Sequence, residues 1–299
     1  MRVAISGSSG LIGSALTRAL EDRGDEVVAL VRSRSDDGAS AALWKTDQGL
    51  LERDPVQGVD AVVHLAGAGI AEKRWTQERK KLIYSSRVEG TRHLVASLAS
   101  LERPPRRFLC ASAIGFYGDR GDERLDETSD SGAGFLAEVC RAWENESRAA
   151  EEFAERVYQI RTGIVLAADG GALAKMLTPF KLGLGGVIGS GRQYMSWIAL
   201  ADEVGAILHL LESDAESGPV NLTAPRPVTN REFTKALGDV LGRPTILPLP
   251  AFAVELIFGQ MGEEALLGSQ RVDPERLAAD GYTFRYRELE ATLRDILDD

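Results

Sequence analysis

The chain has 299 residues, of which 44% are hydrophobic and 27% are charged, a composition typical of a soluble globular protein with a sizeable core. Its 35 basic and 45 acidic residues give a formal net charge of −10. No basic tract outweighs this acidic balance, which argues against nucleic acid or an anionic membrane surface as the main partner.

We expect neither a targeting segment nor a membrane span. Met1 runs straight into strand-like residues, without the basic and apolar regions of a signal peptide. No apolar run approaches the ~18–20 residues that a membrane helix needs. Cys110 and Cys140 suit free thiols in a reducing compartment, so we expect a cytoplasmic protein. The histidines lack metal-ligand spacing, and no metal site is expected.

Residues 3–13 (VAISGSSGLIG) carry the first functional motif. A short apolar run predicts a buried strand, and an amphipathic helix follows from Leu11. Between them, Gly7, Gly10 and Gly13 allow a tight turn that approaches an anion closely, while the helix start supplies unpaired N–H donors. The alternative is a plain turn between strand and helix. We predict that these residues bind a nucleotide phosphate: Gly7, Ser8, Ser9, Gly10, Leu11 and Ile12.

A second strand is predicted over residues 25–31, and Arg32 follows it. In a dinucleotide-binding fold the end of this strand meets the adenosine ribose, where an acidic residue suits a free 2′-hydroxyl and an arginine suits a 2′-phosphate. No acidic residue stands at this strand end, so Arg32 favours NADP over NAD. The alternative is an exposed loop arginine.

Residues 33–58 are polar and irregular, with Trp44 as the only large apolar anchor. A third buried strand over 59–65 ends in small residues, Ala66 and Gly67, against which a flat cofactor can lie. A long helix over 76–99 and a strand over 107–111 follow. The basic segment 73–81 is expected to be the solvated start of that helix, or alternatively to frame an anionic ligand. Strands alternating with helices at this spacing predict an α/β fold, a Rossmann doubly wound parallel sheet.

The second half of the chain continues the pattern with a helix over 135–155, a strand over 157–163 and a glycine-rich passage over 183–200. Asp202 is expected to open a helix, residues 219–222 a short strand, and Thr229 to cap another helix. From Pro248 the chain becomes mostly short helices. We predict a dinucleotide-binding domain over 1–240, with substrate-side segments over about 170–200, and a small helical domain over 241–299.

Several motifs coincide with those of a known superfamily. GSSGLIG, VVHLAG, RVEGT at 87–91, SAIGFYG, RTGIVL and WIALADEV resemble the extended short-chain dehydrogenases/reductases, which include nucleotide-sugar epimerases. The residues after 248 are similar to the short C-terminal domain of one branch, the uncharacterised "epimerase family" proteins of the NAD-dependent epimerase/dehydratase type, sometimes labelled cell-division inhibitors. The resemblance covers residues 1 to about 240 and implies a nicotinamide cofactor.

The superfamily carries its chemistry on a Tyr-x-x-x-Lys pair, and this chain lacks it. The tyrosine exchanges a proton with the substrate, and the lysine lowers the pKa of the tyrosine. At the start of the helix that should hold the pair, the tyrosine position is Phe135 or Leu136 and the lysine position is Val139 or Cys140. Of the catalytic group only Ser112 remains.

Further positions are expected at the cofactor or the substrate, some of them because of the resemblance. Arg87 stands where the superfamily has an asparagine, and it could contact the pyrophosphate or ribose of the cofactor, or a substrate anion, or be an ordinary helix arginine. Ile164, Leu65, Ala66 and Gly67 are expected beside the cofactor. Arg192 and Tyr194 lie in a stretch that resembles the substrate loop, where Arg192 could pair with a phosphate or merely with a surface acid.

Two functions remain open from the sequence. The first is an NADP(H)-binding, epimerase-like oxidoreductase acting on a small molecule, a nucleotide sugar or a carbonyl compound. The second is a non-catalytic NADP-binding sensor or regulatory protein, which the missing Tyr and Lys favour. The oligomeric state is open, although dimers through two long helices are frequent in the superfamily.

Overall fold

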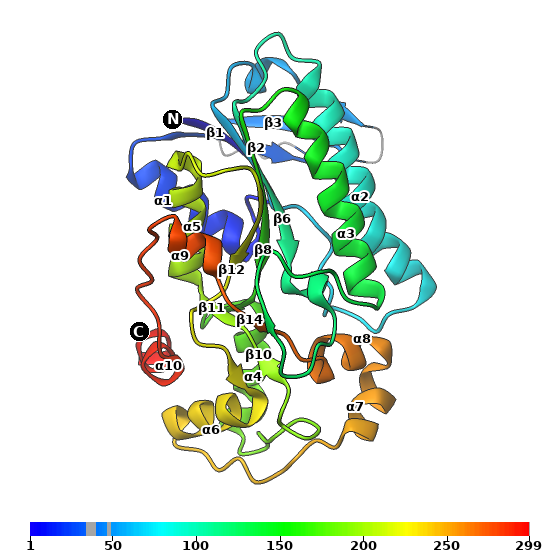
Figure 1. Cartoon of the computed structure of the whole chain (residues 1–299), viewed down its shortest axis with the longest axis vertical. Helices are drawn as coiled ribbons and strands as arrows, with labels where there is room; N and C mark the ends of the chain where they lie inside the picture. Colours follow the sequence, from blue (N-terminus) through cyan, green and yellow to red (C-terminus); the bar gives the residue numbers. More distant parts are fainter. Residues whose placement is uncertain (34–39, 47–48, 299) are drawn as a thin grey trace.

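A computed structural model describes residues 1–33, 40–46 and 49–298 (Figure 1). Its centre is an eight-stranded sheet in the order β12-β8-β6-β5-β1-β2-β3-β4. The strands pair in parallel, except that β4 runs antiparallel to β3. This arrangement confirms the predicted Rossmann-like parallel sheet. The strands of the sheet are β1 (Arg2–Ser6), β2 (Glu26–Val31), β3 (Ala41–Lys45), β4 (Leu50–Leu51), β5 (Ala61–His64), β6 (Arg107–Ala113), β8 (Arg156–Thr162) and β12 (Gly218–Leu222).

Helices cover both faces of the sheet. In Figure 1, α2 (Gln77–Ala99) and α3 (Phe135–Arg148) lie side by side on one face, and α1 (Leu11–Asp22) and α5 (Leu200–Glu212) lie on the other. Because side chains alternate along a strand, Val3 and Ile5 of β1 pack against α1 and α5, whereas Ala4 belongs to the core under α2. A strand covered on both faces needs apolar side chains on both, and the buried centres of β1 (Val3 to Ile5) and β5 (Ala61 to Val63) supply them.

Most of the elements outside the sheet and its covering helices lie in the lower half of the molecule in Figure 1, although the helix at Glu275–Ala279 lies higher, beside α5 and against β12. Three short strand pairs link it together: β9 (Ile164–Leu166) with β11 (Trp197–Ala199), β10 (Tyr194–Met195) with β13 (Val228–Thr229), and β7 (Arg124–Leu125) with β14 (Arg271–Val272). The helices are α4 (Gly171–Lys181), α6 (Asn230–Leu241), α7 (Ala251–Phe258), α8 (Gln260–Gly262), α9 (Glu275–Ala279) and α10 (Leu289–Asp298). The region after Pro248 is therefore mainly helical, as predicted.

The structure corrects several local expectations. Residues 41–45 and 50–51 form strands rather than irregular chain, because β3 extends the sheet beyond β2 and buries Trp44. Asp202 does not cap α5, which begins at Leu200; its carboxylate accepts hydrogen bonds from the backbone N–H groups of Arg285 and Tyr286 instead. Thr229 does cap α6, through a complete capping box.

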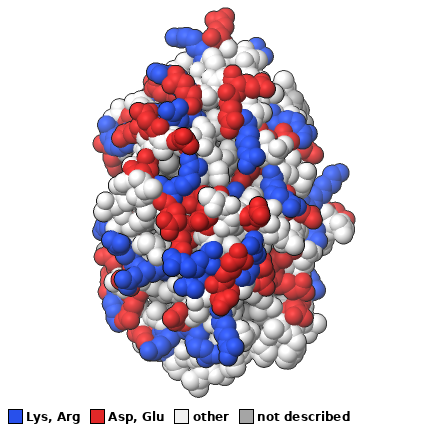
Figure 2. All heavy atoms as spheres, in the orientation of Figure 1, with Lys and Arg blue, Asp and Glu red and all other residues white. Residues whose placement is uncertain are grey.

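The basic segment 73–81 is not simply solvated. The Arg74 side chain donates to the carbonyl of Leu256 at 3.2 Å, and the Lys80 ammonium donates to the side chain of Gln260. The segment therefore anchors the C-terminal helices α7 and α8 to the start of α2. Basic and acidic side chains are interspersed on the face shown in Figure 2. Within the described ranges, no helix combines the length and the apolar character that a bilayer crossing requires.

Candidate functional site

The glycine turn after β1 has the geometry that the sequence predicted. Gly7 has φ 72°, and a Cβ there would lie 3.0 Å from the amide nitrogen of Ala66. A Cβ on Gly13 would lie 2.1 Å from the carbonyl oxygen of Gly7, so α1 packs on the turn only because this residue is glycine. The turn is closed by a hydrogen bond of 3.0 Å from Gly10 N to Gly7 O.

The start of α1 is arranged to receive an anion. Its N-cap, Gly10, offers no side-chain acceptor, and the first turn contains no acidic residue. The first N–H groups of a helix have no intrahelical partner, and the helix dipole places a partial positive charge there. The predicted phosphate-binding residues Gly7 to Ile12 thus lie together at the carboxyl edge of the sheet, beside β5.

A buried polar network, missed in the sequence, fixes the loop after β5. The Ser6 hydroxyl accepts from the backbone N–H groups of Leu65 and Ala66, at 3.1 and 3.2 Å. It therefore donates to His64 Nδ1 at 2.6 Å, and His64 Nε2 donates to Thr91 Oγ1 at 2.9 Å. Burial lowers the pKa of His64 to about 3, so the ring is neutral. The network holds the predicted cofactor loop against the glycine turn.

Arg32 is exposed directly after β2, which pairs in parallel with β1. This is the strand end at which an adenosine ribose lies in dinucleotide-binding sheets. The next residues, 34–39, lie outside the described part of the chain. Arg32 is thus in the predicted place relative to the glycine turn.

Ser112, the predicted catalytic residue, belongs to a buried ionic cluster. Its hydroxyl donates to Glu144 Oε1 at 2.7 Å. The same carboxylate accepts from Arg161 Nε at 2.8 Å and from Nη2 at 2.9 Å, a bidentate pair between α3 and β8. Ser112 and Arg161 are direct neighbours across β6 and β8. Because an ionised carboxylate only accepts, the single proton of Ser112 is committed to Glu144.

Tyr117 extends this cluster away from Ser112. Its hydroxyl accepts from Arg161 Nη1 at 2.9 Å and donates toward Asn221 Oδ1 at 2.8 Å. Burial raises the pKa of Tyr117 to about 12, and its side chain is fully buried. Tyr117 therefore stays protonated near neutral pH and does not act as a base.

Of the two possible registers for the missing Tyr-x-x-x-Lys pair, Leu136 with Cys140 is the one that faces the loop after Ser112. The Leu136 side chain packs at Gly115, in the loop after Ser112, and Cys140 lies within hydrogen-bonding reach of Ser112 and of the Ala113 backbone. Phe135 instead packs edge-on against Trp75, with ring centroids 5.1 Å apart. Burial raises the pKa of the Cys140 thiol to about 11, which keeps it a thiol.

A cavity of 230 Å³ lies beside Leu136. Part of its wall comes from the C-terminal region of the chain, which the sequence did not indicate as part of the site. Glu264, from the C-terminal region, accepts from the backbone N–H groups of Phe135 and Leu136, at 3.0 and 2.8 Å. It thus caps the helix that carries Cys140. The cavity is lined by Gly115, Gly118, Asp119, Ala133, Leu136, Ala137, Glu263, Glu264 and Gln270.

The remaining predicted residues are spread around the site. Arg87 lies between the loop after β5 and Trp143 of α3, with its guanidinium 5.1 Å from the indole ring. Ile164 lies in β9, opposite Trp197. Tyr194 packs under Arg271, and Arg192 is exposed. None of the contacts among the described residues joins Arg192 or Tyr194 to the Ser112 cluster.

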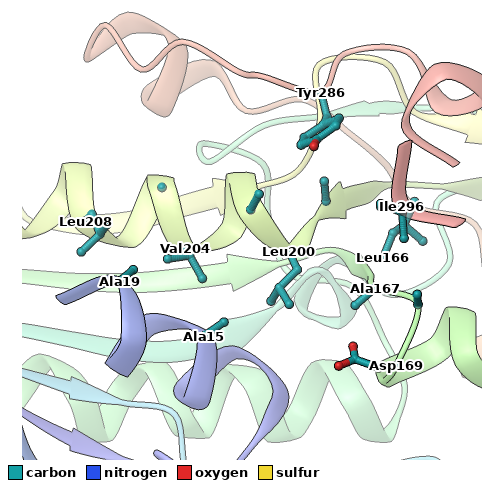
Figure 3. Close-up of a pocket in the computed structure, with 14 residues that line it drawn as sticks. Ala15, Ala19, Leu166, Ala167, Asp169, Leu200, Val204, Leu208, Tyr286 and Ile296 are labelled. Carbon is teal, nitrogen blue, oxygen red and sulfur yellow. The ribbon is translucent and has the colours of Figure 1, made fainter. Parts of the chain in front are cut away.

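A larger groove of 570 Å³ lies on the other face of the sheet (Figure 3). Ala15 and Ala19 of α1 face Leu200, Val204 and Leu208 of α5 across it. Its walls are mostly apolar, and no predicted site residue is among them. The groove is separate from the Ser112 cluster.

Comparison with known proteins relates this arrangement to one family. Residues 3–222 match the model of the NAD dependent epimerase/dehydratase family, and residues 249–296 match a domain of unknown function, DUF1731. The chain is 44% identical to an epimerase family protein of Mycobacterium tuberculosis over 287 residues; this alignment covers 96% of this chain and 94% of that protein. It is 36% identical to the human epimerase family protein SDR39U1 over 300 residues; this alignment covers 99% of this chain and 100% of the human one.

Solved structures agree with this relationship. The crystal structure of human SDR39U1 with NADPH superposes with a TM-score of 0.89 at 34% identity, covering 100% of both chains. MoeE5 in complex with UDP-glucuronic acid and NAD shares the fold, with a TM-score of 0.78 at 21% identity over 100% of this chain and 99% of that one. The chain therefore belongs to the NAD dependent epimerase/dehydratase family and carries the DUF1731 domain at its C-terminal end.

Proposed function

We propose that this protein binds NADPH and acts as an epimerase-like oxidoreductase on a small molecule. The observation that carries the proposal is the start of α1, which has no side-chain cap and packs closely on the glycine turn. Only glycine fits at Gly7 and Gly13, because a Cβ at either position would collide with the backbone. Arg32 at the end of β2 supplies a cation where a 2′-phosphate is bound in folds of this type. The human relative that superposes on this chain was crystallised with NADPH.

The proposed cofactor residues lie at the carboxyl ends of β1, β2 and β5, on α2 and after β8. Backbone N–H groups at the start of α1 would bind the pyrophosphate, and the small residues after β5 would lie against the cofactor. When bound, the nicotinamide supplies or accepts a hydride. The proposed residues are Gly7, Ser8, Ser9, Gly10, Leu11, Ile12, Arg32, Leu65, Ala66, Gly67, Arg87 and Ile164.

Ser112 remains the proposed catalytic residue, in a role that its hydrogen bond limits. Because its proton is directed to Glu144, its oxygen can accept a hydrogen bond from a substrate hydroxyl but cannot donate one to a substrate carbonyl. Leu136 cannot exchange a proton at all. Proton transfer then depends on water or on the Cys140 thiol, at a cost of roughly 10²–10⁴-fold in rate relative to a positioned acid or base.

The substrate is proposed to enter the 230 Å³ cavity beside Leu136. A carbonyl compound fits this space, and the sugar of a nucleotide sugar is the other candidate. Arg192 and Tyr194 keep their proposed roles as substrate contacts, in the substrate-side segments over about 170–200. We also retain the division into domains at 1–240 and 241–299 and a cytoplasmic location as proposals.

A panel of carbonyl compounds and nucleotide sugars, followed by NADPH absorbance at 340 nm, tests the catalytic proposal. We expect one substrate class to give turnover that Ser112→Ala lowers. The matched control is Ser100→Ala, at the exposed end of α2. If wild type turned over none of the substrates faster than Ser112→Ala does, the result would contradict catalysis.

The second candidate is a non-catalytic NADPH-dependent regulator, favoured by Leu136 and Cys140 at the positions that face Ser112. It predicts a protein partner whose capture depends on NADPH. Pull-downs with and without NADPH, repeated with Gly13→Ala, separate the two candidates. A partner that is captured equally under all of these conditions would remove the support for regulation.

A further inference from the structure

The 230 Å³ cavity beside Leu136 carries charge of one sign. Asp119, Glu263 and Glu264 line it, and no lysine, arginine or histidine is among the described residues of its wall. Apart from these carboxylates, Gln270 is the one polar side chain in that lining. A group inside so small a space lies within the Debye length of about 8 Å over which exposed charges act at physiological salt.

The three carboxylates are not neutralised by partners of opposite charge. The carboxylate of Glu263 has neither a hydrogen bond nor an ion pair among the described residues. Asp119 Oδ1 accepts from two backbone N–H groups, at 3.2 and 3.1 Å. Glu264 accepts from the backbone at the start of α3 and from the side-chain amide of Gln260 at 2.7 Å. All of these donors are uncharged, so three formal negative charges remain.

Two cations on neighbouring elements are engaged elsewhere. The guanidinium of Arg120 forms a bidentate pair with Glu123, at 2.8 and 2.6 Å. The Lys80 ammonium donates to the side chain of Gln260, whose amide stands between it and Glu264. Neither cation lines the cavity. An anion that entered would therefore meet repulsion with no counter-charge in the wall.

Ser112 supplies an independent observation of the same kind. It is 4% exposed and stands three residues before Gly115 of the cavity wall. Because its proton is directed to Glu144, it offers a substrate only an accepting oxygen. The ionised side chains of Asp119 and Glu263 also only accept. An ammonium group matches them all, since it has three donors, no acceptor and a positive charge.

We propose that this cavity takes the cationic, amine-bearing end of the substrate and excludes phosphate and carboxylate groups, with Glu263 as the specificity-determining residue. The substrate class is then a small amino alcohol or amino carbonyl compound, and an amino sugar is one example. A nucleotide sugar would have to keep its diphosphate outside the cavity. That the cavity holds the substrate rests on the proposed function, whereas its preference for charge does not.

Thiol labelling of the full chain measures this preference without a known substrate. Ala133→Cys places an exposed thiol in the cavity wall, and Ser100→Cys places one at the exposed end of α2 as the matched control. The native thiols of Cys110 and Cys140 are buried, and wild type gives their background rate. The probes are two methanethiosulfonates, one with an ethyl-trimethylammonium tail and one with an ethyl-sulfonate tail. The ratio of their rates cancels differences in thiol reactivity.

At low salt we expect the ratio of cationic to anionic labelling to be roughly tenfold higher in Ala133→Cys than in Ser100→Cys. Adding Glu263→Gln to Ala133→Cys should lower the ratio several-fold, whereas adding Glu290→Gln, at an exposed site paired with Arg294, should not. Equal ratios at the two thiols overturn the proposal. An elevated ratio that Glu263→Gln leaves unchanged overturns the role of Glu263.

Two further measurements keep this inference apart from the proposed function. In the turnover panel, glucosamine should react faster than its carboxylate counterpart glucuronate, and the reverse order overturns the substrate class. Wild type whose cavity prefers the cationic probe but that does not bind NADPH contradicts the proposed function alone. Wild type that binds NADPH, with equal labelling ratios at the two thiols, contradicts the charge preference alone.

Discussion

The buried carboxyl of Glu203 predicts how strongly the free energy of unfolding depends on pH. Its side chain, in the first turn of α5, is fully buried on the α1 side of the sheet. Oε1 accepts from Thr162 Oγ1 at 2.8 Å, and Oε2 has no partner among the described residues. Burial raises the pKa of Glu203 from 4.5 to about 8, against which the Thr162 hydrogen bond acts only weakly.

This shift makes the protein less stable as pH rises. In the unfolded chain the carboxyl ionises with the ordinary glutamate pKa of 4.5, whereas the folded protein holds the proton until about 8. Between these values the unfolded state binds fewer protons, so the free energy of unfolding falls with pH and levels off above 8. A shift of about 3.5 pKa units corresponds to a loss of at most about 5 kcal/mol.

Glu203→Gln removes the ionisation while keeping the size and one hydrogen-bond acceptor. Between pH 5 and 8.5, we expect the free energy of unfolding to fall by several kcal/mol less in the variant than in wild type. At pH 8.5 the variant should therefore be the more stable protein. Urea unfolding followed by circular dichroism at several pH values measures the difference. Glu290→Gln, at an exposed site paired with Arg294, is the control and should follow wild type within about 0.5 kcal/mol. Parallel curves for wild type and Glu203→Gln would refute the reasoning.

Three further predictions follow from single contacts. Gly13→Ala places a methyl group 2.1 Å from the Gly7 carbonyl and should weaken NADPH binding at least tenfold in a fluorescence titration, whereas Gly90→Ala, with its nearest atom 3.9 Å away, should not; equal affinities would contradict this. Glu144→Gln leaves its arginine partner buried and uncompensated and should cost about 3–5 kcal/mol in urea unfolding, so a loss below about 1 kcal/mol would count against it. Glu264→Ala uncaps α3 and should cost about 1–2 kcal/mol; an unchanged unfolding midpoint would contradict this.

The sequence predicts the features that neighbouring residues determine. The strand, glycine turn and helix over residues 2–22 are contiguous, so spacing alone indicates them, and the structure agrees. The capping box at Thr229 is equally local. The strand containing Trp44 was missed because it is short and is stabilised by pairing with β2 rather than by its own pattern.

The candidate site depends on contacts that no local pattern reveals. Glu144 and Arg161 come from a helix and a strand and meet Ser112 only through the register of β6 and β8. One signal was present: a charged residue inside a strand that is otherwise buried must have a partner. Glu264 gave no such signal, since it reaches α3 from 128 residues away along the chain.

The central claim, an NADPH site built by the glycine turn and Arg32, is tested most directly by calorimetric titration of NADPH and NADH into wild type and Arg32→Ala. We predict that wild type binds NADPH more tightly than NADH, and that Arg32→Ala loses most of this preference while its affinity for NADH stays the same. Equal affinity of wild type for both cofactors, or no binding of either, would contradict the claim.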